Sequence, residues 1–188
     1  MTPKIEIVTF YVEGTHGLLM RNPDSMSRTS EVTMNRKVIP SAADEAKSNV
    51  YATEDGFMWF PAQAFKSAMV KAVGGKRIGK ATARSVISCT VFPAEERVLL
   101  IHPKTKKQIR ASEFDVDTRR VVVQKSGIKR SRPLVKAWAC LLPLEIRETI
   151  SVDVALQALQ AAGTDIGVGD YRPQTGGPFG RFKVTLAK

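Results

Sequence analysis

The fold of this chain is decided by its last helix, loop and strand, residues 151–187, SVDVALQALQAAGTDIGVGDYRPQTGGPFGRFKVTLA. Ser151 is a typical N-cap, and the apolar residues after it recur at helical spacing, which predicts a helix over 151–162. Alternation of apolar and basic residues at the other end predicts a strand over 180–187. The Gly-rich segment, residues 167–184, joins the two and carries five glycines and two arginines.

Four further elements precede this stretch. A strand is expected over 4–12, in a central position because apolar residues occupy both of its faces. A helix follows over 61–73, then strands over 86–92 and 133–146, and Gly163 is expected to end the last helix. The order βαββαβ predicts an α+β fold with a ferredoxin-like or RRM-like core and long insertions.

The length of 188 residues predicts a single RRM-like domain, residues 1–188. Residues 14–60 are expected to form an insertion made of a loop, a short helix that begins after Ser41 and a hairpin. Residues 93–130 are expected to form a protruding hairpin or finger, because β-prone runs flank a turn-rich region there.

Charge points to an anionic partner. The chain has 29 Lys and Arg residues against 18 Asp and Glu residues, a formal net charge of +11. Residues 61–94 and 119–144 contain several basic residues and no acidic one. Such unneutralised basic stretches are typical of proteins that bind nucleic acid.

Other classes of protein are disfavoured. No apolar run reaches the ~20 residues that span a bilayer, and the N-terminal residues alternate instead of forming a signal peptide. Cys89 and Cys140 lack metal-binding spacing, and His16 and His102 have no ligand-like neighbours in the sequence. We therefore expect a cytoplasmic protein with no membrane partner, no cofactor, no structural metal and no disulfide.

Glycines in the Gly-rich segment let the backbone turn with positive φ and approach a ligand closely, and exposed N–H groups in such loops bind anions. The segment, the helix that follows Phe60-Pro61 and the G-x-x-x-Leu-Leu pattern of Gly14–Leu19 together resemble the RAMP superfamily of CRISPR-associated proteins. The resemblance is to the backbone subunits that polymerise along guide RNA and to phage-encoded relatives of that type. It implies a chain that tracks a nucleic-acid backbone with little sequence specificity, in a bacterial or phage-infected host cell.

The resemblance implies three groups of binding residues. Cations would neutralise phosphates, glycine N–H groups would approach them, and aromatic rings, including Trp59, would stack on bases. The predicted nucleic-acid-binding residues are Lys66, Lys71, Lys76, Arg77, Lys80, Arg84, Arg130, Arg132, Gly167, Gly169, Tyr171, Arg172, Gly176, Gly177, Phe179 and Arg181.

Two other functions stay open. Some RAMP proteins are endoribonucleases, for which His16 is the candidate base and Asp24 the candidate acidic residue, although binding without catalysis is the expectation here. The chain could also mimic a CRISPR backbone subunit and insert into a host complex. The resemblance further implies head-to-tail self-association, whereas the choice between RNA and DNA follows from no residue that the sequence singles out.

Overall fold

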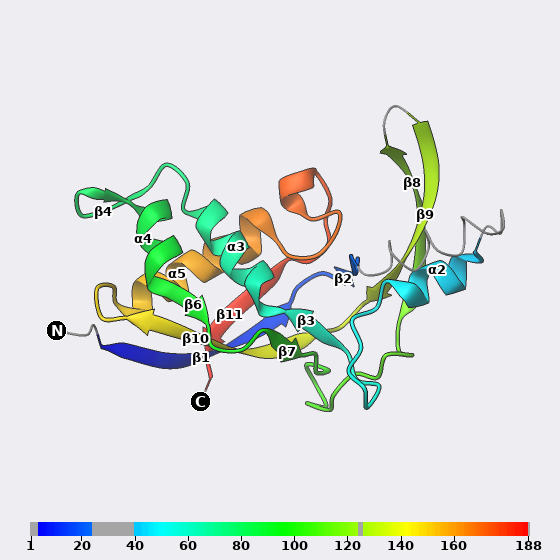
Figure 1. The fold of residues 1–188 in the computed structure, drawn as a ribbon, viewed down its shortest axis with the longest axis horizontal. Coiled ribbons are helices and arrows are strands. Elements are labelled where there is room, and N and C mark those ends of the chain that lie inside the picture. Colours follow the sequence, from blue (N-terminus) through cyan, green and yellow to red (C-terminus); the bar gives the residue numbers. More distant parts are fainter. Residues whose placement is uncertain (1–3, 24–39, 124–125, 188) are drawn as a thin grey trace.

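The computed structural model describes residues 4–23, 40–123 and 126–187 of the chain. Its central sheet has four antiparallel strands in the spatial order β11-β1-β10-β6 (Figure 1). These strands are β1 (Ile5–Gly14), β6 (Val91–Pro93), β10 (Ala139–Arg147) and β11 (Phe182–Leu186). With helices α3 (Ala62–Ala72) and α5 (Val152–Ala161), the chain order is β1-α3-β6-β10-α5-β11, which confirms the predicted βαββαβ core.

The sheet has one covered face and one open face. Phe10 and Val12 of β1 are fully buried beneath α3 and α5, where Phe65 of α3 also packs. Ile5 and Ile7 belong to the other face and are 50% and 63% exposed. Strand β1 does lie inside the sheet, as the apolar residues on both of its faces predict, but one of these faces is open to solvent.

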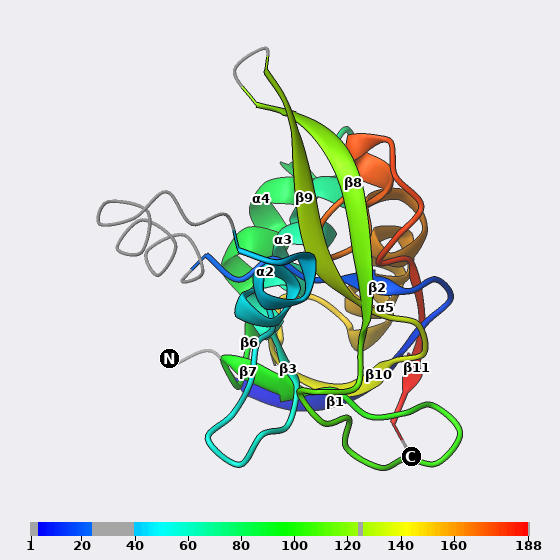
Figure 2. The ribbon, with the colours of Figure 1, turned by 90° about the vertical axis from the view of Figure 1, so that its right-hand side faces the viewer.

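A long two-stranded hairpin rises from the body of the molecule (Figure 2). It consists of β8 (Asp115–Val123) and β9 (Ser126–Val135), and the base of β9 also pairs with the short strand β2 (Leu18–Leu19). Helix α2 (Ala42–Ser48) packs beside it, capped by the Ser41 hydroxyl, which accepts from the N–H of Asp44 at 3.2 Å.

The finger expected over 93–130 thus begins later in the chain and includes all of β9. Residues before it form β7 (Arg97–Leu99), which pairs with β3 (Trp59–Pro61) next to the start of α3. The β-prone runs that flank the turn-rich region do not pair with each other: β7 pairs with β3, and β8 pairs with β9.

The strand predicted over 86–92 is wrong for most of its length. Residues 83–90 form helix α4 (Ala83–Thr90), and only Val91–Pro93 are extended. Thr82 caps α4 through its hydroxyl, which accepts from the N–H of Ser85 at 3.4 Å. Before it, β4 (Arg77–Ile78) and β5 (Ala81–Thr82) form a small hairpin.

Two other boundaries differ from the prediction. Gly163 does not end the last helix, because a π-helical turn (Ala162–Ile166) continues to Gly167, whose φ is 70°. The Cβ that any other residue would place at 163 would meet Phe182, so this glycine allows close packing of helix against β11. The strand predicted over 133–146 is divided where Trp138 turns into the core and donates from Nε1 to the carbonyl of His16 at 2.9 Å.

Candidate nucleic-acid interface

The Gly-rich segment is a closed loop tied to the start of the chain. The N–H of Gly180 donates to the carbonyl of Gly17 at 2.8 Å, and the N–H of Asp170 donates to that of Leu19 at 2.8 Å. Gly180 has a φ of 67°, and a Cβ there would collide with the carbonyl of Val168. Close approaches within the protein therefore require this glycine.

Most of the predicted glycine donors are already used inside the loop. The N–H groups of Gly167, Gly176 and Gly177 donate to carbonyls of Ala162, Pro173 and Arg172 at 2.8, 2.9 and 3.0 Å. The expectation that these N–H groups bind phosphate is wrong, because each of them has a partner within the chain. Gly169, with a φ of 79°, lies over the carbonyl of Leu19 and lets β2 pass closely.

Tyr171 and Phe179 form an aromatic pair on this loop. Their ring centres are 6.2 Å apart at an interplanar angle of 51°, and Tyr171 is 37% exposed. The backbone of Tyr171 has a φ of 46°, an uncommon conformation for a non-glycine residue. This turn is stabilised by the Asp170 carboxylate, which accepts from the N–H of Tyr171 at 2.9 Å.

Arg119 of β8 covers both rings. Its guanidinium carbon lies 5.5 Å from the ring centre of Tyr171 and 4.9 Å from that of Phe179. Asp117 accepts from Nε and Nη2 of Arg119 at 2.7 and 3.0 Å, and this hydrogen bonding raises the pKa of the guanidinium. A permanently charged group therefore joins the β8–β9 hairpin to the Gly-rich segment.

Lys71 and Arg172 meet around one amide oxygen. Lys71 Nζ, from α3, donates to Oε1 of Gln174 at 3.2 Å, and Arg172 Nη2 donates to the same oxygen at 3.0 Å. Arg172 Nη1 also donates to the carbonyl of Gly169 at 2.7 Å. The two cations are thus held at the mouth of a small hollow, of about 100 Å³, between α3 and the loop.

A second hollow, of about 270 Å³, continues along the start of α3. Arg21, Tyr51 and Arg172 supply its polar rim, and Ala64 and Gly169 are among its small residues. The two hollows share Ala64, Gly169 and Arg172, so we name them together the α3 groove. Small side chains line the α3 groove, and its rim carries Lys71 and Arg172 together with Asp170, whose carboxylate is paired with the buried Arg132. The cations of this rim could bind a phosphate chain.

Two of the predicted cations are not available to a ligand. Arg132 is 6% exposed and its Nη1 donates to Oδ2 of Asp170 at 2.6 Å, so it supports the Gly-rich segment from below. Lys66 is 9% exposed, and its Nζ lies 3.6 Å from the ring centre of Phe92. Burial lowers the pKa of Lys66. Both residues were predicted from basic stretches without acidic residues, and such stretches do not show which side of an element faces the core.

The remaining predicted cations lie in separate places. Arg130 is within 3.5 Å of the Glu45 carboxylate, and Arg181 is half-buried with a carbonyl that accepts from Thr15. A third group is exposed on the β4–β5 hairpin and the first turn of α4, at the opposite end of the helical layer from the β8–β9 hairpin (Figure 1). This group consists of Lys76, Arg77, Lys80 and Arg84.

The structure describes one of the two residues considered for catalysis. His16 is exposed, and its Nδ1 lies 3.3 Å from the hydroxyl of Thr15, while Asp24 lies outside the described residues.

Trp59 packs on Tyr51, with ring centres 4.8 Å apart, and under Arg97, away from the loop. Within residues 4–23, 40–123 and 126–187, no His, Cys, Asp and Glu side chains gather to hold a metal ion, and no helix is long and apolar enough to cross a membrane.

Arg119, Arg21 and Tyr51 contribute to this region but were not predicted as site residues. Arg119 could have been found from its place in the second acid-free stretch, although sequence spacing does not show that it reaches Tyr171. Arg21 and Tyr51 are brought to α3 by long-range packing, as in the hydrogen bond from the Tyr51 hydroxyl to the carbonyl of Arg21 at 3.0 Å. Their sequence neighbourhood carries no signal for this.

Comparison with known proteins identifies the fold. No family model matches the chain, and no curated protein matches it by sequence. Among solved structures, the crystal structure of Cmr6 from Pyrococcus furiosus is similar over 96% of this chain and 98% of that chain, with a TM-score of 0.52 and 11% sequence identity. The chain therefore shares the overall fold of Cmr6.

Proposed function

We propose that this protein binds single-stranded nucleic acid along its backbone, with little sequence specificity, in the α3 groove and against the β8–β9 hairpin. The observation that carries the proposal is the cluster of Arg119, Tyr171 and Phe179 beside the paired cations Lys71 and Arg172. Proteins that bind single strands combine these two features, a cationic groove and aromatic rings on which bases stack.

The aromatic pair favours a single strand over a duplex. A base stacks on Tyr171 only when it is released from its neighbours, and duplex bases are not. The exposed ring of Tyr171 lies on a loop whose conformation is set by hydrogen bonds, so little ordering is needed on binding.

Low specificity follows from the kind of groups present. The ends of Lys71 and Arg172 converge on a shared amide oxygen and would contact phosphates, which carry no sequence information. Stacking on an aromatic ring tolerates every base, because each base has a π-face.

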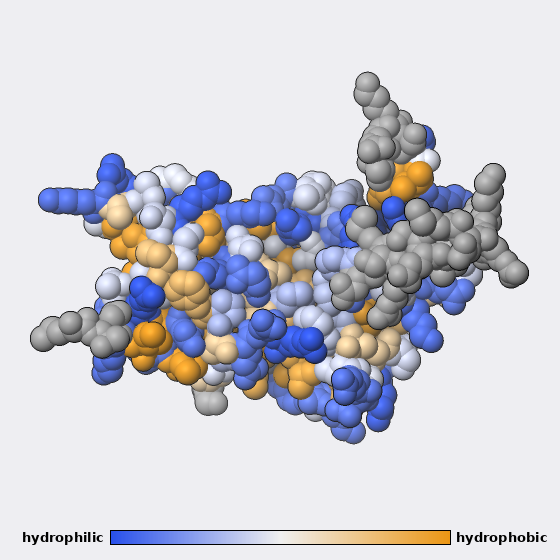
Figure 3. Space-filling model, viewed as in Figure 1, coloured by the Kyte–Doolittle hydropathy of each residue, from blue (hydrophilic) through white to orange (hydrophobic). Residues whose placement is uncertain are grey.

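The path of the strand is suggested by the surface. Hydrophilic residues occupy much of the rim that runs from the β4–β5 hairpin past α3 toward the Gly-rich segment (Figure 3). Lys76, Arg77, Lys80 and Arg84 would extend the contact of a longer strand beyond the α3 groove. The RAMP-like fold supports RNA as the ligand and head-to-tail self-association along it as part of the same proposal.

Photo-cross-linking to a strand that contains 4-thiouridine or 4-thiothymidine tests the proposed location. Digestion and mass spectrometry are expected to find the cross-link on peptides that contain Tyr171 or Phe179. Cross-links confined to the open face of the sheet, around Ile7, would contradict it. The length of the strand should be varied, because only long strands are expected to cross-link to the β4–β5 hairpin as well.

A further inference from the structure

Strands β7 and β10 begin to pair and then separate. Ile101 and Ala139 exchange two backbone hydrogen bonds of 2.8 Å, as a hydrogen-bonded antiparallel pair does. Continuing this register by two residues places Leu99 opposite Leu141. No backbone hydrogen bond joins Leu99 to Leu141. At the other end, the pairing of β6 with β10 extends to Ala94, whose N–H donates to the carbonyl of Pro143 at 3.1 Å.

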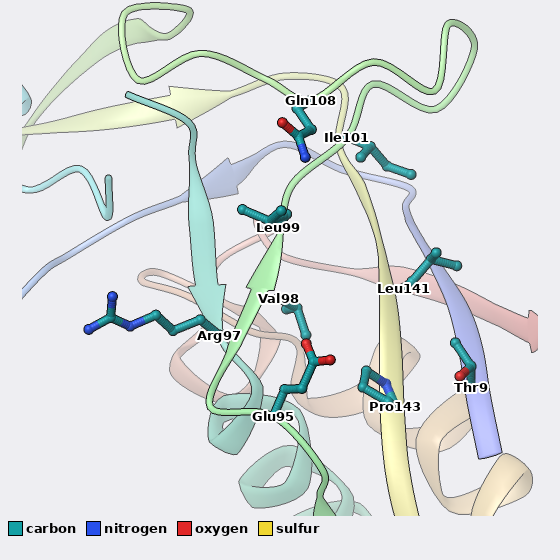
Figure 4. Close-up of a pocket in the computed structure, with 9 residues that line it drawn as sticks. All are labelled: Thr9, Glu95, Arg97, Val98, Leu99, Ile101, Gln108, Leu141 and Pro143. Carbon is teal, nitrogen blue, oxygen red and sulfur yellow. The ribbon is translucent and has the colours of Figure 1, made fainter. Parts of the chain in front are cut away.

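The opening between these two closures is a cavity of about 510 Å³ on the open face of the sheet. Figure 4 shows Leu99 and Leu141 on its two sides, Ile101 near the end where the ribbons converge, and Glu95 with Pro143 toward the other end. We name it the Leu99–Leu141 slot. Its volume lies within the range of small-molecule sites, and aliphatic residues make up most of its lining. Its polar lining residues are Thr9, Glu95, Arg97 and Gln108.

Backbone polar groups face this slot from both sides. In an extended strand, residues two apart direct their N–H and C=O groups to the same edge. Leu141 lies between Ala139 and Pro143, which both bond toward the side of β7 and β6, so its own N–H and C=O point there too. Leu99 is opposite Trp59 in a pair that leaves its N–H and C=O on the edge away from β3, toward the slot.

The shape excludes a peptide strand as the occupant. A strand that completed the sheet would have to run past both ends, but the Ile101–Ala139 pair and the Ala94–Pro143 contact close them. A flat ligand that enters from the open face has no such obstacle. One strand residue offers a donor and an acceptor to the edge of such a ligand, and Leu99 and Leu141 flank it on the two sides.

We propose that the slot binds a purine base that presents an adjacent donor and acceptor, of which adenine is the simplest. Adenine carries an amine donor next to a ring-nitrogen acceptor, matching the C=O and N–H of Leu141. Because Thr9, Leu99 and Leu141 lie on the face of the sheet opposite α3 and α5, this site is separate from the α3 groove. The base can come from a free nucleoside or from a strand bound elsewhere on the protein.

Titration calorimetry with adenosine tests the proposal. We expect saturable binding with a dissociation constant on the order of 0.1 to 1 mM. Purine riboside, which lacks the 6-amino group, is expected to bind about tenfold more weakly, because the Leu141 carbonyl then loses its donor. No saturable binding of adenosine up to about 10 mM, or equal binding of the two nucleosides, would overturn the proposal.

Variants locate the site. Leu141→Trp fills the slot and is expected to weaken adenosine binding at least about tenfold. Ile7→Trp is the matched control, because Ile7 is 63% exposed on the same face and does not line the slot. Leu99→Trp fills the slot from the other side and replaces the first variant if that one does not fold. Full adenosine binding by either folded slot variant would overturn the proposal.

Oligonucleotide binding shows whether the base comes from a bound strand or from a free nucleoside. It also distinguishes this proposal from the proposed function of the α3 groove. If the slot takes a base from a bound strand, Leu141→Trp weakens binding of oligo(A) and leaves oligo(U) unchanged. If it takes a free nucleoside, both oligonucleotides bind as before while adenosine binding is lost. If the proposed function of the α3 groove is wrong, we expect neither oligonucleotide to bind, while adenosine binding stays intact.

Discussion

The guanidinium carbon of Arg119 lies 4.9 Å from the centre of the Phe179 ring, and this contact joins the β8–β9 hairpin to the Gly-rich segment. The same guanidinium is held by Asp117 and also covers Tyr171. Two parts of the chain that are far apart in sequence thus form one cationic and aromatic surface. This surface, next to the α3 groove, is the basis of the proposed function.

Tyr171→Ala is expected to weaken binding of a single strand by about 5- to 150-fold, because one stacked base is worth ~1 to 3 kcal/mol. Tyr171→Phe keeps the ring and should retain most of the affinity. Tyr11→Ala serves as the control, since Tyr11 is on the open face and contacts Lys106. Fluorescence anisotropy at fixed salt measures all three, and equal losses in Tyr171→Ala and Tyr11→Ala would count against stacking at the loop.

Asp170→Asn is expected to destabilise the fold by about 1 to 3 kcal/mol. Arg132 is buried and would lose its charged partner, although Asp170 keeps 30% of its side chain exposed, which reduces the penalty. The comparison is Glu13→Gln, which removes the partner of Lys183 in a more exposed pair and should cost less than about 1 kcal/mol. Urea denaturation monitored by circular dichroism gives both values, and similar losses would contradict a structural role for Arg132.

Gly180→Ala and Gly176→Ala are expected to differ sharply. Both glycines have positive φ, 67° and 81°, but a Cβ at 180 would collide with the Val168 carbonyl whereas nothing lies within 4 Å of one at 176. The strain at Gly176 is expected to cost about 1 kcal/mol, and the collision at Gly180 clearly more. Thermal melts compare the two, and equal melting temperatures would show that the loop adjusts freely.

Lys66→Met is expected to stabilise the protein at neutral pH, provided that the relief of desolvation exceeds the loss of the contact between Lys66 and the Phe92 ring. Burial lowers the pKa of Lys66, so the unfolded chain holds the proton more tightly than the folded protein does. The resulting destabilisation is complete below the lowered pKa and disappears as pH rises toward 10.5. The stability difference between wild type and Lys66→Met should therefore shrink at alkaline pH, and a pH-independent difference would contradict this origin.

Removing two cations of the β4–β5 hairpin, with Lys76→Ala and Lys80→Ala together, is expected to weaken binding of long strands and to lower the salt slope by about two. Strands too short to leave the α3 groove should bind unchanged. Lys104→Ala with Lys107→Ala is a matched control, because these exposed lysines lie in the loop after β7. An equal effect of both pairs on long strands would indicate nonspecific attraction to net charge.

Capping signals made the helices predictable. Pro61 and Ser151 mark the starts of α3 and α5, and the apolar spacing behind them is regular, so both helices are found within one or two residues. Helix α4 was missed because Val86 and Ile87 favour strands by propensity, while its cap, Thr82, lies in a stretch that reads as a loop. Its packing on α3 decides the conformation.

The candidate site was predicted only in outline. The Gly-rich segment does carry the aromatic pair and Arg172, as expected. The burial of Arg132 and Lys66 depends on which side of an element meets the core, and that follows from long-range packing. The contact of Arg119 with Phe179 depends on the pairing of β8 with β9, a partner choice that local sequence leaves open.

The most direct test of the central claim is fluorescence anisotropy with labelled single-stranded RNA, single-stranded DNA and duplex DNA of equal length, each over a salt series. We expect preferential binding of single strands, with a steep negative dependence of log K on log salt. The ratio of RNA to DNA affinity then identifies the ligand. Absence of binding at low salt, or tighter binding of the duplex, would contradict the account.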